Sequence, residues 1–147
     1  MKPISYLYLL AADQDFRLLH GRGSEFVEIT HRTADEFPDV EDRQSGGQSL
    51  SHAGRQGQSF EVGPQGRKDH IERDRFARHV AQAVAAEWDK GGHDRIVIAA
   101  GPKMLGALRD ALPKALHSHI AAEVHKDLVK VPVHELPSHF AGTILAV

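Results

Sequence analysis

The chain has 147 residues, 41% of them hydrophobic, and it contains no cysteine. This length suits one domain with a buried core, and the absence of thiols excludes disulfides, thiolate metal sites and thiol nucleophiles. A net charge of −2 argues against a protein that coats nucleic acid by bulk electrostatics. The first apolar run, residues 4–12, is too short to cross a bilayer. We therefore expect one cytoplasmic domain over residues 1–147, without membrane association.

Three strand-like runs open the chain. Residues 4–11 (ISYLYLLA) are apolar, aromatic and β-branched, as in a buried strand. Residues 16–20 and the alternating stretch at 26–30 follow after short turn sequences. Because these connections are short, we expect the three strands to pair as an antiparallel meander.

A long polar loop is expected at about residues 33–68, where Gly, Gln, Ser and charged residues replace the apolar periodicity. Connections of this length inside a small domain are normally either functional or disordered. Between Arg43 and Lys68 this loop carries four basic residues against the single acid Glu61, and the helix expected after it adds three arginines. The same charges are also typical of a solvated helix face beside a polar insertion. The basic residues are Arg43, Arg55, Arg67, Lys68, Arg73, Arg75 and Arg78.

An amphipathic helix is expected after the loop. Asp69 and Glu72 form a capping-box pattern, which predicts that the helix begins at Asp69. Apolar residues recur at every fourth position from Phe76 to Trp88, so this stripe should face the core. The glycine pair at 91–92 is expected to end the helix.

The rest of the chain alternates between strands and helices. Residues 95–100 (RIVIAA) form a continuous apolar run, typical of a strand covered on both faces. Pro102 opens a second helix, residues 120–125 alternate like an edge strand, and Pro132 opens a last short helix. Together these elements predict an α/β fold: a mixed sheet, built from a three-strand meander plus a β-α-β unit, with helices packed on it.

The segments IVIAAGPKMLGALRDAL, RDRFARHVAQAV and EVHKDL resemble bacterial proteins required for attachment to host cells, and the similarity extends over nearly the whole chain. That family is similar in turn to the middle domain of archaeal and eukaryotic peptide release factors. This likeness implies a three-layer, ribonuclease-H-like topology. In the release-factor domain a Gly-Gly-Gln-Ser loop precedes a long basic helix, and Gly46, Gly47, Gln48 and Ser49 match that loop. Here the insertion after Gln48 is longer, and many attachment proteins lack the tripeptide.

The resemblance implies binding to the ribosome and peptidyl-tRNA, with hydrolysis of the peptidyl ester and no cofactor. Gly46 and Gly47 would let the backbone adopt positive φ and approach the acceptor end of the tRNA. The Gln48 amide would stabilise the oxyanion, and its side chain would orient a water molecule. The seven basic residues named above would hold phosphates. The alternative is a non-enzymatic interaction module linked to host-cell attachment, in which the Gly-rich loop is a flexible contact surface.

Three other residue patterns in the sequence bear on function: the histidines, a glycine-containing turn and several acids. The eleven histidines, His117, His119 and His125 among them, fix no set of three ligands, so no metal site is predicted. Residues 101–106 lack the Lys-Ser/Thr of a phosphate loop, but a helix N-terminus beside Lys103 could bind an anion. A ribonuclease-H-like topology also raises metal-dependent nuclease activity, although most of its acidic candidates fall in expected turns. Those candidates are Asp13, Asp15, Asp94, Glu123 and Asp127.

Overall fold

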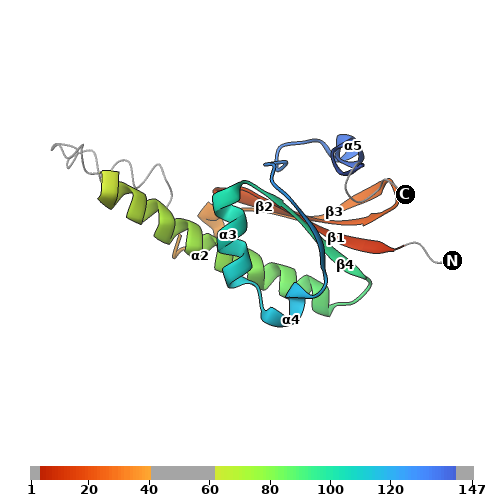
Figure 1. Cartoon of the computed structure of the whole chain (residues 1–147). Helices are drawn as coiled ribbons and strands as arrows, with labels where there is room; N and C mark the ends of the chain where they lie inside the picture. Colours follow the sequence, from red (N-terminus) through yellow and green to blue (C-terminus); the bar gives the residue numbers. More distant parts are fainter. Residues whose placement is uncertain (1–3, 41–61, 142–147) are drawn as a thin grey trace.

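The computed structural model describes residues 4–40 and 62–141, with side chains of the second segment from His70 onward. Three strands come first and are followed by a mixture of helices and two further strands, and Figure 1 shows the helices arranged around one sheet. In chain order the elements are β1 (Ser5–Ala11), β2 (Asp15–Arg22), β3 (Glu25–Thr33), the 3₁₀ turn η1 (Ala34–Glu36), α2 (Val62–Asp89), β4 (Arg95–Ala100), α3 (Pro102–Ala111), α4 (Lys114–His117), β5 (Ile120–Val124), the 3₁₀ turn η4 (Val133–Glu135) and α5 (Leu136–Phe140).

The five strands form one mixed sheet in the order β3-β2-β1-β4-β5. Strand β1 is antiparallel to β2, and β2 is antiparallel to β3, which confirms the predicted meander. Strand β4 is parallel to β1, and β5 is parallel to β4 at the sheet edge. The predicted α/β class and the mixed sheet are therefore confirmed, and the ribonuclease-H-like assignment stays a prediction.

Apolar side chains cover both faces of the central strands. Alternate residues of β1 and β4 point to opposite faces, so each strand contributes to two separate core clusters. Helices α2 and α3 cover one face, while α5 and the chain after β5 cover the other (Figure 1). All residues of β4 from Ile96 to Ala100 are fully buried, as the sequence predicts.

Helix α2 is longer than predicted. It begins at Val62, so the predicted start at Asp69 is wrong, and the loop predicted at about 33–68 extends too far at its carboxyl end. Pro64 lies in the first turn, where a missing amide hydrogen removes no helical hydrogen bond. Once the buried face after residue 76 anchors the helix, each preceding residue adds one bond at little cost. Among the described residues, no helix has the length and hydrophobicity needed to cross a membrane.

Buried Arg17 connects β2 to the chain between β5 and η4. Only 6% of this residue is exposed. Its Nε is 2.7 Å from Glu28 Oε1, and its Nη1 donates hydrogen bonds to the carbonyl oxygens of Val129, at 2.8 Å, and Val131, at 2.7 Å. These bonds hold an irregular segment against the sheet.

Gly21 lies directly under the ring of Tyr8, which is fully buried. A Cβ at this position would be 2.4 Å from Tyr8 Cε2. The ring has little freedom to move, because Phe26 lies 4.4 Å and Phe140 4.8 Å from its centroid. The close packing of the aromatic layer therefore depends on a glycine here.

We expect Gly21→Ala to lower the free energy of unfolding by about 1–3 kcal/mol, because the new methyl group overpacks the aromatic layer. The matched control is Gly106→Ala in α3, where no atom lies within 4 Å of the added Cβ. That change should raise stability by about 0.5–1 kcal/mol through helix propensity. Urea unfolding measures both, and equal effects of the two substitutions would contradict this account.

Candidate functional site

A cleft of about 610 Å³ lies between α2 and α3, and we call it the α2–α3 cleft. It lies beyond the carboxyl ends of the parallel strands β1 and β4, since α3 begins immediately after β4. Ligands of open α/β sheets commonly bind at this edge. The lining residues are His70, Arg73, Asp74, Pro102, Lys103, Gly106, Ala107, Arg109 and Asp110.

Basic side chains in the cleft differ in how fully their charges are compensated. Arg73 Nε lies 3.6 Å from Asp13 Oδ1, within ion-pair range but beyond hydrogen-bond length. Arg109 binds Glu123 through two nitrogens, and these bonds lower the pKa of Glu123. Lys103 is exposed and forms no ion pair with a residue of the described segments. It is therefore the basic group of the cleft most available to an anion.

The amino end of α3 adds a second source of positive potential. Gly101 is the N-cap and supplies no side-chain hydrogen bond, and Pro102 occupies the first turn. The first helical bond runs from the Leu105 amide to the Gly101 carbonyl, at 2.9 Å. The preceding amides of Lys103 and Met104 therefore have no helical acceptor. Free amides and the helix dipole favour an anion at this position.

The structure separates the arginines of α2 that the sequence groups as one RNA-binding patch. Arg73 lines the α2–α3 cleft, with 12% of its side chain exposed. Arg75 lies 4.0 Å from Glu72 and donates a hydrogen bond to the Asp39 carbonyl. Arg78 is exposed and forms no ion pair within the described part of the chain. Of the three, Arg73 lines the cleft, whereas Arg75 and Arg78, neighbours on the helix surface, lie outside its lining.

The remaining predicted site residues lie wholly or partly outside the described part of the chain. Arg67 and Lys68 belong to the backbone of α2, but their side chains lie outside the described part. The residues that lie wholly outside it are Gly46, Gly47, Gln48, Arg43 and Arg55.

The cleft also contains residues that sequence reasoning missed. His70 and Arg109 were not predicted as site residues, because nothing in the local pattern indicates that α2 packs beside α3. In the sequence, the position of Lys103 after the Gly-Pro turn was the one feature that indicated an anion site here.

The histidines and acids considered from the sequence are dispersed. His117 and His125 line a pocket beside β5, whereas His119 packs against Trp88 with ring centroids 4.8 Å apart. Within the described segments no three His, Asp or Glu side chains are placed to hold a metal ion. The acids proposed for a nuclease each have a separate partner: Arg73 for Asp13, His31 for Asp15, the Ser5 amide for Asp94, Arg109 for Glu123 and the Val129 amide for Asp127.

A pair of histidines at the opposite end of the sheet was not predicted. His20 Nδ1 on β2 lies 3.2 Å from His93 Nδ1, just before β4. His93 Nε2 lies 3.2 Å from Glu87 Oε2 near the end of α2. Burial lowers the pKa of His20, and His93 and Arg22 lower it further. The folded protein therefore favours neutral His20.

Acidification should weaken the fold through His20. Because the pKa of His20 is lower in the folded state, the unfolded chain binds more protons, and stability falls as pH drops below about 6.5. We expect His20→Gln, which cannot titrate, to show a shallower fall between pH 7.5 and 5.5. Urea midpoints of both proteins across this range measure the difference, with pH 8 as the reference. Parallel curves would contradict the expectation.

A family model described as "Protein required for attachment to host cells" matches residues 9–140. No curated protein matches the chain at a significant level. The family resemblance predicted from the sequence is confirmed, and the relationship to release factors stays a prediction. Since the match extends over nearly the whole chain, the protein belongs to the family of proteins required for attachment to host cells.

Proposed function

We propose that this protein works in translation in the cytoplasm, where it binds the ribosome and peptidyl-tRNA. The observation that carries the proposal is the α2–α3 cleft. In it Lys103, without an acidic partner among the described residues, lies at the free amide end of α3. His70 and Arg73 face the same space from α2. A phosphate of an RNA backbone suits such a site, because helix amides and basic side chains bind phosphate without reading the base.

Helix α2 follows the Gly-Gly-Gln tripeptide in the sequence. The helix is continuous from Val62 to Asp89, and it passes the cleft at His70 and Arg73. Arg67 and Lys68 belong to the same helix, between the tripeptide and the cleft residues in the sequence. A nucleic acid held by the cleft would therefore lie beside the helix that carries these basic residues.

The chemistry proposed for the tripeptide needs no titrating group. Gly46 and Gly47 give the backbone access to positive φ and leave room for the tRNA end. The Gln48 amide hydrogen stabilises the oxyanion that forms when water attacks the ester carbonyl, and the Gln48 side chain orients that water. The ester C–O bond breaks, so the peptide leaves as a carboxylate and the tRNA regains its hydroxyl group.

The catalytic step is tested by peptide release from stalled ribosome complexes. We expect wild type to release peptide, and Gly47→Ala to reduce the rate at least about 100-fold, since a Cβ opposes the required backbone conformation. Gln48→Ala keeps the backbone amide, so it should lose less. Ser49→Ala, beside the tripeptide, is the matched control and should retain activity.

Two outcomes would contradict hydrolysis in different ways. Co-sedimentation with ribosomes without peptide release would favour the non-enzymatic interaction module. Absence of both binding and release would remove the translational proposal altogether.

The cleft is tested separately by the salt dependence of RNA binding. Lys103→Gln should weaken ribosome association and reduce the slope of log K against log salt by about one, as expected for one lost phosphate contact. Lys114→Gln, an exposed lysine on α4 outside the cleft, is the matched control. If both changes alter the slope equally, attraction is diffuse and the cleft is not the RNA site.

A further inference from the structure

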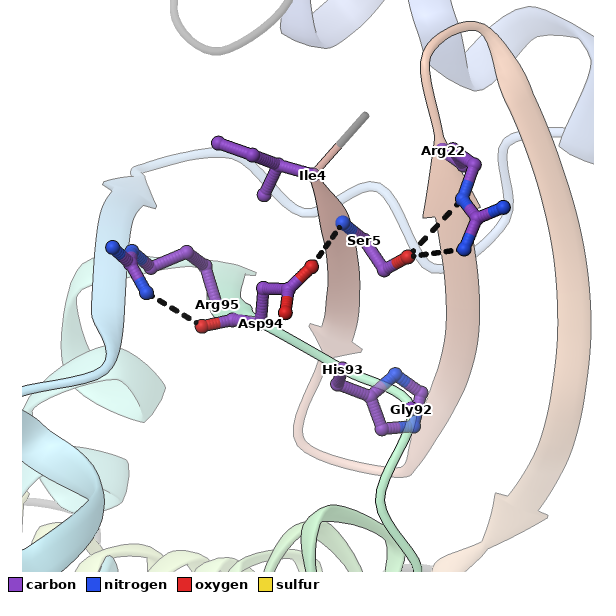
Figure 2. A pocket seen from close by; sticks show the side chains of 7 residues that line it. All are labelled: Ile4, Ser5, Arg22, Gly92, His93, Asp94 and Arg95. Atoms are coloured by element: carbon purple, nitrogen blue, oxygen red, sulfur yellow. Dashed lines mark hydrogen bonds between the residues drawn. The ribbon is translucent and has the colours of Figure 1, made fainter. Parts of the chain in front are cut away.

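A second cavity, of about 450 Å³, lies at the opposite end of the sheet, where β1 and β4 begin. We call it the strand-start cavity, and Figure 2 shows its lining. A volume of this size is in the range of small-molecule sites. The lining residues are Ile4, Ser5, Arg22, Gly92, His93, Asp94 and Arg95.

Sheet register places the charged groups of the cavity at the same end of the sheet, with Arg22 on the face of Ser5 and Arg95 on the face of Tyr6. Ser5 at the start of β1 is paired with Arg22 at the end of β2. Arg95 at the start of β4 is paired with Tyr6 in the neighbouring parallel strand. Two arginines that are distant in sequence thus flank the first residues of β1, one from each side (Figure 2). The positions of both backbones are fixed by strand pairing.

The arginines of this cavity have no carboxylate partner in the described part of the chain. Most other described arginines lie within 4.0 Å of an acid, namely Arg17, Arg32, Arg73, Arg75 and Arg109. Arg22 Nε and Nη2 instead donate to the neutral hydroxyl of Ser5, at 3.2 and 3.0 Å. Arg95 Nη1 donates to the Asp94 carbonyl, at 2.8 Å. Neither guanidinium group forms an ion pair with a residue of the described segments.

Asp94, the one acid in the lining, forms hydrogen bonds with the backbone of Ser5. Asp94 Oδ2 accepts a hydrogen bond from the Ser5 amide at 2.9 Å, and the Asp94 amide donates to the Ser5 carbonyl at 2.8 Å. Asp94 lies between the two arginines in Figure 2 but forms no ion pair with either. The lining therefore carries two fixed positive charges against one negative charge.

His93 completes one wall without offering a free nitrogen. Its Nδ1 faces His20, and its Nε2 faces Glu87. Only 4% of its side chain is exposed, so the ring is held in place by its two partners. A ligand in the cavity would meet the arginine donors and the exposed side chain of Ile4.

We propose that the strand-start cavity is a binding site for a small organic anion with a carboxylate or phosphate group, to which Arg22 and Arg95 contribute from the two sides of β1. A guanidinium group presents paired N–H donors that match either anion, and Arg22 is already oriented by Ser5. The inference is independent of RNA binding at the α2–α3 cleft, because the two sites lie at opposite ends of β1 and β4.

NMR titration of the ¹⁵N-labelled full chain tests this site with inorganic phosphate and with acetate, each against sodium chloride at equal ionic strength. We expect saturable shifts of the Ser5 and Arg95 amides and of the Arg22 and Arg95 Nε–H signals. Arg22→Gln or Arg95→Gln should weaken binding about five- to tenfold, as for one lost charge-assisted contact near solvent. Asp94→Asn keeps the acceptor for Ser5 and removes the opposing charge, so it should tighten binding.

Lys114→Gln is the matched control, since Lys114 is exposed and without an acidic partner in the described residues but lies outside the cavity. Its affinity should equal that of wild type. Saturation by phosphate alone would identify a phosphate site, and saturation by acetate alone would identify a carboxylate site. Comparable saturation by both would identify a site for either group. No saturable shift with either anion, or equal weakening by Lys114→Gln, would overturn the proposal. Unchanged spectra of the remaining residues verify that each variant is folded.

Discussion

The hydrogen bonds of buried Arg17 hold in place the chain segment that covers the second face of the sheet. The chain between β5 and η4 has no regular backbone pairing of its own, yet Val129 is buried within it. Arg17 supplies the missing donors by binding the carbonyls of Val129 and Val131. A buried cation is tolerated only with such partners, and removing one side of a buried pair generally costs about 3–5 kcal/mol. The aromatic layer around Tyr8 and Phe140 is positioned by the same chain segment.

With both faces covered, the two ends of the central strands are where polar groups can gather. The carboxyl ends of β1 and β4 lead into the α2–α3 cleft, and their amino ends form the strand-start cavity. Within the described residues, basic side chains without an acidic partner lie at each end: Lys103 at the cleft, and Arg22 and Arg95 at the cavity. Lys103 lies beside a helix terminus, whereas Arg22 and Arg95 lie on strands next to β1. The two ends of one sheet thus present unpaired positive charge in different surroundings.

Much of the fold was predictable, because it follows from local patterns. The apolar run at 95–100 indicated a doubly covered strand, and the stripe beginning at Phe76 indicated the buried face of α2. The start of α2 was mispredicted because a capping-box pattern can also occur inside a helix. Arg17 occupies an interior position that no alternation rule assigns to a cation, since its carbonyl partners are remote in sequence. The convergence of His70, Lys103 and Arg109 likewise depends on packing between helices, which single-sequence patterns do not encode.

The early part of α2 gives the protein an arm. From Arg73 back to Val62 the helix continues for about 16 Å at the usual rise per residue, and Figure 1 shows it extending past the sheet. Because α2 is one continuous helix, the orientation of its buried half also sets the direction of its first turns. The direction of this arm is set by the way the other half of α2 lies on the sheet. Substitutions in that remote half can therefore tilt the arm and redirect its tip without altering a single residue there.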